Sequence, residues 1–467
     1  MPDYSQSSTT SSVPTNEYYT TTLATAFQQF LFDEDVDRQE SYRLYREYYD
    51  GKHALMLTDR QKEFLEHKAD TDFLANYCQI VVDVVAERLR VLDFDVVGGR
   101  SLADAAPERL WWDYNEMDGQ QVDVHTCALR DGDTYVLIEW DDEAQMPLYT
   151  LEEAFDGAEG VAVAYRDDRR SEIEYAVKYW RSTNPTEAGW IQRATVYRAD
   201  SVAKYYFDSR KGGASAWALA EPPIPWVSRE GKPLGVPVVH FRHKANGKRH
   251  GLSKLEIVIP LQNLLNKTLI DLVGAADAGG FRLLVMIGNE PGDNFRVHPG
   301  AILSMPNLKN EGEIKAIPGE DMRPMIETVD SMVQRIGQVT RTPLSYFQVS
   351  GQLASEGTQK QQEAGLISQC GAIAVHFGNS WERLSLLGRK VYNAFNAANE
   401  GLPLERARVI WDDFEIRDRW AHKLAQAQIV GSLTSAGGSL RGAAVFAGVP
   451  ERDVQALELV DLTMSEQ

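Results

Sequence analysis

The 467-residue sequence is poor in cysteine and contains no long apolar run. Its three cysteines, Cys78, Cys127 and Cys370, lie too far apart in sequence to form a metal-ligand pair. We therefore expect them to be small buried residues of a protein in a reducing compartment. No segment approaches the roughly 20 apolar residues that span a bilayer, so we expect no contact with a membrane. Residues 1–34 include a Ser/Thr-rich stretch without signal-peptide features, and we expect a flexible N-terminal arm.

The sequence motifs of common enzymes are also missing. The chain has no GxGxxG, no Walker-type phosphate loop, no HExxH and no GxSxG. Because a nucleotide-driven motor needs a phosphate-binding loop, the chain has no motor of its own. We expect no catalytic residue, no cofactor and no metal ion.

Positive charge is scarce and unevenly distributed. The net charge is −20, with 68 acidic and 48 basic side chains, which argues against a protein that grips nucleic acid over its whole surface. Residues 1–253 carry −15 and residues 400–467 carry −4, whereas residues 254–399 are nearly balanced at −1. The middle of the chain is therefore the part best suited to contact a polyanion without binding it tightly.

The patterns before residue 253 predict an α+β domain. Helical spacing covers residues 33–49, 75–90, 107–117 and 120–132, and strand-like runs follow from residue 134 to residue 241, separated by turn residues. Helices come first and a mostly antiparallel sheet follows. A loop rich in glycine and proline covers residues 211–235.

The remainder of the chain is mainly helical. Ser253 and Glu256 form a possible capping box for a helix over residues 253–278, and Pro260 predicts a kink in it. Residues 281–323 read as short strands and turns, and a second helix occupies 324–341. Apolar residues then recur every three or four positions from Leu366 to Phe395, which predicts a helix of roughly eight turns. A strand at 408–418 and helices from 419 to about 460 end the chain.

The connection between these helices has an unusual composition. Residues 342–358, TPLSYFQVSGQLASEGT, hold a single charge, Glu356. A loop of this length inside a compact domain is typically either functional or disordered. Its glutamines, serines and glycines offer weak, exchangeable hydrogen bonds and a backbone that can change shape. The alternative is an ordinary disordered surface loop.

Three weaker candidates have plainer explanations. Asp412 and Asp413 could be a catalytic carboxylate pair, but the solvated end of a strand is the favoured interpretation. The segment HFRHKANGKRH, at 240–250, is the only basic cluster; His243 and His250 could hold a metal ion or phosphate there, but we favour an exposed charged turn. The aromatic pairs at 48–49 and 111–112, and Phe377 and Trp381, are expected in the core or at an interface.

Several segments together resemble the portal proteins of tailed double-stranded-DNA bacteriophages, of the type found in phages with long non-contractile tails. They are YYDGKH (48–53), NYCQIVVDVVAERL (76–89), RDGDTYVLIEW (130–140), VPVVHF (236–241) with HGLSKLEIVIPLQNLLNKTLID (250–271), residues 342–370 and FGNSWERL (377–384). Their order and spacing carry the resemblance over about residues 35–465. One departure is Ser355-Glu356-Gly357, where the family often shows a Ser-Gly-Glu-like start to the next helix.

The resemblance implies a portal fold with an α/β wing, a helical stem, a small β-containing clip, a long spine helix and a helical crown. The wing would begin at residues 35–252 and end with the spine helix and strand of 359–418. Stem helices would occupy 253–278 and 324–341, with the clip at 279–323, and the crown would be 419–467. Residues 342–358 would form a tunnel loop facing DNA, through Ser345, Gln348, Ser350, Gly351, Gln352, Ser355 and Thr358. Met286, Ile287 and Phe295 would be the clip's partner contacts.

Such a protein would be a structural homo-oligomer, commonly a ring of twelve subunits, at one vertex of the virion capsid. It would be assembled in the host cytoplasm and would form a channel for packaging and ejecting double-stranded DNA, which it contacts transiently and without sequence specificity. Its partners would be the terminase large subunit, the head–tail adaptor and the major capsid or scaffolding protein. The alternatives are a soluble α+β hydrolase that uses Asp412 and Asp413, or another head–tail structural protein.

Overall fold

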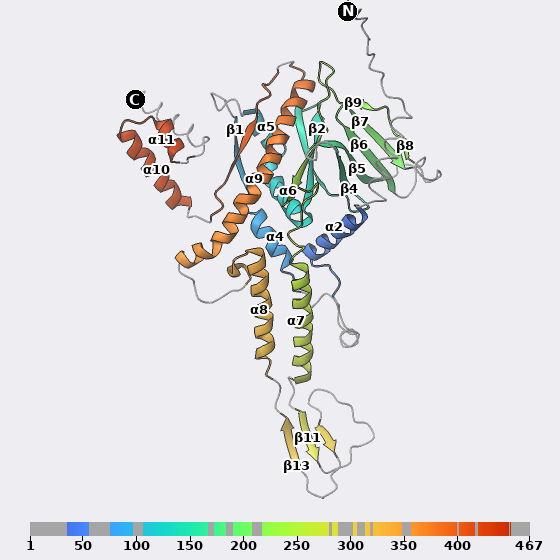
Figure 1. The fold of residues 1–467 in the computed structure, drawn as a ribbon, viewed down its shortest axis with the longest axis vertical. Helices are drawn as coiled ribbons and strands as arrows, with labels where there is room; N and C mark the ends of the chain where they lie inside the picture. The colour runs from blue at the N-terminus through green and yellow to red at the C-terminus, as the bar shows by residue number, and fades with distance from the viewer. Residues whose placement is uncertain are drawn as a thin grey trace, which may run out of the picture. The chain divides into compact units, whose positions relative to one another are not determined.

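A computed structural model gives the fold of the chain (Figure 1). It describes residues 35–55, 75–96, 106–166, 172–183, 190–207, 217–279, 283–287, 302–305, 313–317, 321–347, 356–398, 401–415, 419–447 and 449. The N-terminal arm expected at 1–34 lies outside them. The chain divides into two compact units. The first unit comprises Met1–Arg43, Val85–Ser253 and Ile367–Gln467, and the second comprises Leu44–Val84 and Lys254–Leu366.

The first unit combines helices with antiparallel sheets, as the sequence predicts for an α+β fold. One sheet has the order β10-β2-β3 and another has the order β4-β5-β6-β7-β8, with β9 paired to β7. A two-stranded sheet joins β1 to β14. The strands are β1 (Val91–Val96), β2 (Asp133–Asp141), β3 (Met146–Glu153), β4 (Gly160–Tyr165), β5 (Ile173–Thr183), β6 (Trp190–Arg198), β7 (Ser201–Phe207), β8 (Trp217–Leu219), β9 (Ile224–Pro225), β10 (Val238–Arg242) and β14 (Ala407–Trp411).

Helix α9 (Glu356–Phe395) supplies much of the core of the first unit. Its apolar face is buried as the spacing predicts, with Phe377 and Trp381 fully buried, and the helix runs unbroken through Gly371 and Gly378. The Trp381 indole N–H donates to Nε2 of His125 at 3.0 Å, and His125 Nδ1 lies 2.9 Å from the Leu89 carbonyl oxygen. Burial lowers the pKa of His125 to about 3, although the Leu89 contact acts in the opposite direction. This imidazole is therefore neutral at physiological pH.

A buried ion pair fixes the C-terminal half of α9. Arg389 donates to both carboxylate oxygens of Glu108, on α5 (Ala106–Tyr114), and both side chains are almost completely buried. Ser385 donates to the same carboxylate at 2.8 Å, and Arg389 also donates to the carbonyl oxygen of Pro403 at 2.9 Å. The pair is bidentate and has further hydrogen bonds, the geometry in which a buried ion pair offsets its desolvation.

The break between α5 and α6 (Met117–Asp131) comes earlier than the sequence predicts. Asn115 ends α5 because its side-chain amide donates to the carbonyl oxygens of Trp111 and Pro147, at 2.7 and 3.0 Å. Its Oδ1 accepts from the backbone N–H of Tyr149 at 2.7 Å. Glu116 then takes a left-handed conformation with φ of 51° before α6 begins. One asparagine thus ends the helix and holds it to β3, a long-range role that periodicity does not reveal.

The second unit is organised around two helices, α7 (Ile259–Gly279) and α8 (Arg323–Thr340), which pack against each other. Between them in the sequence comes a small sheet of order β12-β11-β13, with β11 (Leu283–Ile287), β12 (Ile302–Met305) and β13 (Glu313–Ile317). Strand β11 pairs in parallel with β12 and antiparallel with β13. A β insertion between two helices is what the pattern of residues 281–323 predicts.

The start of α7 corrects the predicted helix at 253–278. Ser253 does not cap a helix, because its hydroxyl donates to the carbonyl oxygen of Arg130 instead. Residues 254–258 form turns, and the helix begins at Ile259. Pro260 consequently lies in the first turn, where its missing N–H costs no hydrogen bond, and it does not kink the helix.

The predicted burial of the cysteines is confirmed, and the last predicted strand is shorter than expected. All three cysteines are buried, and burial raises the pKa of Cys78 to about 12. The strand predicted at 408–418 ends at Trp411, and the C-terminal helices are α10 (Arg419–Ser435) and α11 (Leu440–Phe446), which pack on each other around Val430. In the described parts of the chain, no helix has the length and apolar character that crossing a membrane requires. The N-terminal helices are α2 (Asp35–Asp50) and α4 (Cys78–Ala86).

Candidate channel loop and its anchorage

The predicted loop of residues 342–358 is described at its two ends. Ser345 is exposed on a short 3-10 helix, Leu344–Tyr346. Helix α9 begins at Glu356, so the predicted loop residue Thr358 belongs to its first turn. The other predicted loop residues, Gln348, Ser350, Gly351, Gln352 and Ser355, lie outside the described residues.

The beginning of the loop is tied to the end of α8. Arg341 takes a left-handed conformation with φ of 56°, which reverses the chain after the helix. The backbone N–H of Thr342 then donates to the Gly337 carbonyl oxygen at 2.9 Å. The Thr340 hydroxyl donates to the Thr342 hydroxyl at 2.9 Å, and Thr342 is only 3% exposed. The loop therefore leaves a fixed point rather than a fraying helix end.

Close packing at Gly337 continues this anchorage. A Cβ at this position would lie 2.8 Å from Cδ2 of Leu344 and 3.1 Å from the Thr342 carbonyl oxygen. Phe347 reaches the same place, and its ring also meets Tyr77 edge to face, with ring centroids 5.6 Å apart. Residues 342–347 therefore fold back on α8. The sequence shows the neutral composition of the loop but not this docking.

Helix α7 is anchored by a row of uncharged polar side chains. Gln262 is fully buried; it accepts from the Tyr77 N–H at 3.0 Å and donates to the Ala75 carbonyl oxygen at 2.5 Å. Tyr48 donates its hydroxyl proton to Asn263 at 2.6 Å. The buried Asn266 side chain lies 3.2 Å from His53, whose ring stacks on Tyr48. These contacts unite the segments YYDGKH, NYCQ and LQNLLNKT. The sequence marks the three segments but does not reveal the row of polar side chains on α7 that joins them.

The segments RDGD and HGLS meet in the first unit. A Cβ on Gly251 would lie 2.1 Å from the Gly132 carbonyl oxygen, so the two backbones can approach only because residue 251 is glycine. Gly132 has φ of 93°, and its carbonyl oxygen accepts from the His243 N–H at 2.9 Å. His243 is only 2% exposed, which corrects the prediction of an exposed basic turn at this end. The turn's tip at 246–249 is exposed.

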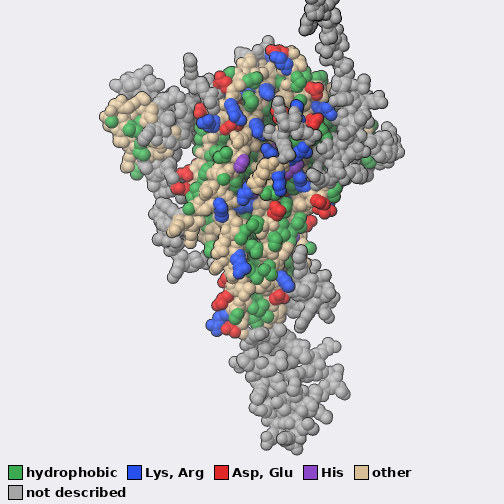
Figure 2. All heavy atoms as spheres, in the orientation of Figure 1, with side chains coloured by type: hydrophobic (Ala, Val, Ile, Leu, Met, Phe, Trp, Pro, Cys, Tyr) green, Lys and Arg blue, Asp and Glu red, His purple; other side chains and the backbone are tan. Residues whose placement is uncertain are grey.

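Charges on α7 and α8 are mixed. Lys267 and Asp271 are exposed on α7, and Glu327, Asp330 and Arg335 are exposed on α8. On the face shown in Figure 2, Lys and Arg side chains are interspersed with Asp and Glu. Apolar side chains are exposed on the same two helices, namely Leu264, Ile326 and Val339. The described surface of these helices has no single-sign run of charge.

The residues predicted as clip contacts and as a catalytic carboxylate pair lie in a β-strand and in a turn. Met286 and Ile287 are the last residues of β11, the central strand of its sheet, and Phe295 lies outside the described residues. Asp412 accepts from the backbone N–H of Asp413 at 2.9 Å, and Asp413 accepts from that of Glu415 at 3.1 Å. The two carboxylates thus stabilise a turn at the end of β14. Nothing in this arrangement supports a hydrolase.

A model of the family described as "Phage portal protein, SPP1 Gp6-like" matches residues 28–438, which is most of the chain. The chain belongs to this portal protein family. The family is one of structural portal proteins and not of enzymes, and the role of this chain is a structural portal role. A search of curated proteins found no match.

Among solved structures, the portal chain is similar to a chain in the neck of an empty gene transfer agent (GTA) particle computed with C6 symmetry. The identity is 12% and the TM-score 0.43, with 86% of this chain and 96% of the other covered. A chain in the neck of the native particle, computed with C12 symmetry, is 11% identical with a TM-score of 0.42, covering 88% and 99%. A chain in the virion of the native GTA particle is 12% identical with a TM-score of 0.39, covering 88% and 99%.

Proposed function

We propose that this portal chain forms a closed ring, commonly of twelve subunits in such proteins, at one vertex of a capsid. Double-stranded DNA passes through the ring during packaging and ejection. Family membership over residues 28–438 supports this proposal, and so does the nearly uncharged loop whose start is held at a fixed point after α8. We assign residues 35–252 and 359–418 to the wing, 253–278 and 324–341 to the stem, 279–323 to the clip, 342–358 to the tunnel loop and 419–467 to the crown.

The chemistry of the tunnel loop fits a surface past which DNA slides. Each phosphate neutralised by a lysine or arginine adds salt-dependent affinity, which would slow movement. The loop carries only Glu356 among its 17 residues, and the exposed charges of α7 and α8 are of both signs. Gln348, Ser350, Gln352 and their neighbours can form and release hydrogen bonds to passing phosphates without a lasting ionic contact. The docked residues 342–347 set where the loop begins.

Assembly is tested by negative-stain images and sedimentation of the purified chain. A ring with a central hole supports the proposal. The exposed Leu264, Ile326 and Val339 are side chains that a neighbouring subunit could cover in such a ring. Sedimentation at the monomer mass of 52.4 kDa across all concentrations would contradict it.

Contact between the loop and DNA is tested by adding charge. In a ring of twelve, Gln348→Lys with Gln352→Lys places about 24 extra cations around one duplex. Packaging or ejection should slow, and higher salt should relieve the defect because counterions compete for phosphate. The matched control is the pair Gln348→Ala and Gln352→Ala, which should be much milder. If the lysine pair behaves like the unchanged chain at two salt concentrations, the loop does not meet DNA.

The clip is the proposed platform for the terminase large subunit and then the head–tail adaptor. Met286 and Ile287 lie on β11, in a three-stranded sheet too small to bury a core of its own. Deleting residues 289–314 should leave the first unit folded but abolish ring formation or packaging. The control is the fold of the first unit, read from tryptophan fluorescence. Normal rings that package normally would show that the clip lies elsewhere. Contact with the major capsid or scaffolding protein, and assembly in the host cytoplasm, belong to the same proposal.

A further inference from the structure

A carboxylate and two imidazoles meet inside the first unit, where the segments RDGD and HGLS approach each other. Asp133 begins β2, His240 lies on β10 and His250 ends the basic turn that follows β10. Asp133 Oδ1 is 2.8 Å from His240 Nε2, and Asp133 Oδ2 is 3.4 Å from His250 Nδ1. One ligand atom from each residue lies within 4.8 Å of the other two. Asp133 and His240 are buried, and His250 is half-buried.

The carboxylate of Asp133 has no lysine or arginine partner among the described residues. Its hydrogen bonds come from His240, from the Tyr42 hydroxyl at 2.7 Å and from the Gly251 N–H at 2.7 Å. Burying a carboxylate without a cation is costly. His250 Nδ1 is shielded from solvent and, apart from the Asp133 Oδ2 atom 3.4 Å away, has no polar partner within the described structure. A cation between these groups would neutralise the first and use the lone pair of the second.

The spacing of the three groups suits a small tetrahedral cation. With metal–ligand bonds of about 2.0–2.1 Å, as for zinc, neighbouring ligand atoms lie roughly 3.3 Å apart. The measured separations, 2.8 Å from His240 Nε2 to Asp133 Oδ1 and 3.4 Å from His250 Nδ1 to Asp133 Oδ2, are near this value and run to the two different oxygens of the carboxylate. Two imidazoles and one carboxylate are ligands that zinc accepts, whereas calcium and magnesium prefer oxygen alone.

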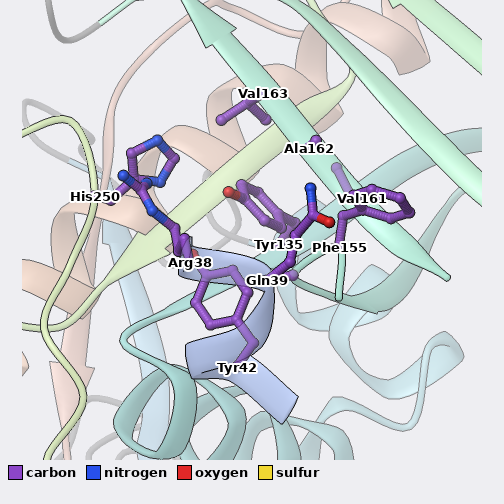
Figure 3. A pocket seen from close by; sticks show the side chains of 10 residues that line it. Arg38, Gln39, Tyr42, Tyr135, Phe155, Val161, Ala162, Val163 and His250 are labelled. Carbon is purple, nitrogen blue, oxygen red and sulfur yellow. The ribbon is translucent and has the colours of Figure 1, made fainter. Parts of the chain in front are cut away.

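The surroundings supply the support that metal ligands need. The hydrogen bonds from Tyr42 and Gly251 orient the Asp133 carboxylate, and the Tyr165 hydroxyl contacts the other ring nitrogen of His240. Beside His250 is a cavity of about 20 Å³, also lined by Tyr42, Tyr135 and Arg38 (Figure 3). Asp133 and His240 do not line this cavity, whose volume holds about one water on the His250 side of the site.

We propose that Asp133, His240 and His250 bind one zinc-type divalent cation that fastens the turn of residues 243–250 to the sheet of β10 and β2. The site has a structural role and no part in moving DNA. Arg38 lines the same cavity, so the cation must be held by strong nitrogen ligands rather than by charge alone. The other histidine of the turn, His243, points elsewhere, since its Nδ1 lies 2.7 Å from the Leu252 carbonyl oxygen. Because the three ligands are separated by more than 100 residues of chain or by a turn, no sequence motif marks the site.

The test uses the full chain without an affinity tag, stripped with a chelator and titrated with Co²⁺ as the spectroscopic probe. We expect about one Co²⁺ per chain, with the visible absorption of a tetrahedral site. The His250→Gln variant should lose this absorption. The matched control is His376→Gln, which removes an exposed histidine of α9 and should keep it. Absence of the absorption from the unchanged chain, or its persistence in His250→Gln, would overturn the proposal.

A second variant guards against loss of folding. His250→Cys should keep the cation and add a thiolate-to-cobalt charge-transfer band, because sulfur would replace nitrogen as the ligand. The melting temperature should rise when Zn²⁺ is added to the stripped chain, and to His376→Gln, but not to His250→Gln. A His250→Cys chain that binds Co²⁺ without the new band would show that residue 250 is not a ligand. That result, too, would overturn the proposal.

Discussion

The two units of this portal chain differ in the polar contacts that hold their cores. The first unit buries charge: Arg389 with Glu108 inside the helical core, and Arg130 with Asp131 at 2.7 Å. The second unit buries Lys254 together with amides and hydroxyls such as Gln262, and its ion pair between Lys52 and Asp50 lies at the surface. Buried charge specifies one arrangement strongly, because any other arrangement leaves an ion unpaired. Breaking a neutral hydrogen bond costs less free energy, so an element held by such bonds can shift more easily.

This contrast follows the proposed division of labour. In the proposed ring, the wing would present the same surface to the capsid throughout, and a strongly specified core would suit it. The proposed stem and loop would lie where neighbouring subunits and DNA meet, and neutral contacts would permit small adjustments there. The exposed apolar side chains of α7 and α8 agree with this view, because they leave the second unit's surface to be completed by other copies. Substitutions that remove one kind of contact or the other test the contrast.

The largest effect is expected from breaking the buried ion pair. Glu108→Ala leaves the buried Arg389 guanidinium without its carboxylate, so the free energy of unfolding should fall by about 3–5 kcal/mol. Urea unfolding measures this. Glu327→Ala, at an exposed position of α8, is the control and should change the value by less than about 0.5 kcal/mol. The double variant Glu108→Gln with Arg389→Met should lose less than Glu108→Ala alone. A loss below about 1 kcal/mol for Glu108→Ala would refute the importance of buried charge in the first unit.

The corresponding change in the second unit is Gln262→Ala. It leaves the part-buried Tyr77 N–H and Ala75 carbonyl without their partner, and an unpaired polar group costs about 1–3 kcal/mol when it is buried. We expect a loss of roughly 3 kcal/mol, from the same urea measurement. The exposed Gln334 of α8 provides the control, since Gln334→Ala should be nearly neutral. Equal results for the two glutamines would mean that the polar row of α7 does not hold the second unit together.

A pH experiment separates the buried imidazole of the first unit from surface histidines. The pKa of His125 is depressed to about 3 in the folded chain, against about 6.5 when unfolded. The unfolded state therefore takes up a proton first, and stability is lost as pH falls from 6.5 toward 3. Between pH 7 and 5, this group should remove roughly 2 kcal/mol, and His125→Gln should be correspondingly less pH-dependent. Urea unfolding at both pH values measures the difference, with His376→Gln as the control. Identical pH dependence of His125→Gln and the unchanged chain would contradict the assignment.

Local patterns predicted much of the fold, because helix periodicity depends on neighbours in the sequence. The apolar spacing from Leu366 to Phe395 predicted where α9 ends, although the helix begins earlier, at Glu356. The start of α7 was not predictable, because Ser253 is drawn away by the Arg130 carbonyl, 123 residues earlier. The candidate loop likewise has one property that the sequence reveals and one that it does not. The near-neutral composition of the loop can be read from the sequence. Its anchorage depends on the packing of Tyr77 against Phe347, a contact that forms only when the chain folds.

The smallest effect compares two glycines inside helices, Gly337 in α8 and Gly371 in α9. Removing a glycine from a helix interior stabilises it by about 0.5–1 kcal/mol when space allows. A Cβ on Gly371 meets nothing within 4 Å, so Gly371→Ala should raise the free energy of unfolding by about that amount.

A Cβ on Gly337 would lie 3.1 Å from the Thr342 carbonyl oxygen and 2.8 Å from Leu344. The Leu344 side chain can turn aside, but the backbone oxygen is fixed by the chain reversal at Arg341. Gly337→Ala should therefore lower the free energy of unfolding, by about 1 kcal/mol, and loosen the docked start of the tunnel loop. Urea unfolding gives the two signs, and hydrogen exchange at residues 342–347 shows whether the turn opens. If both substitutions stabilise the chain and exchange is unchanged, the loop does not depend on close packing at Gly337.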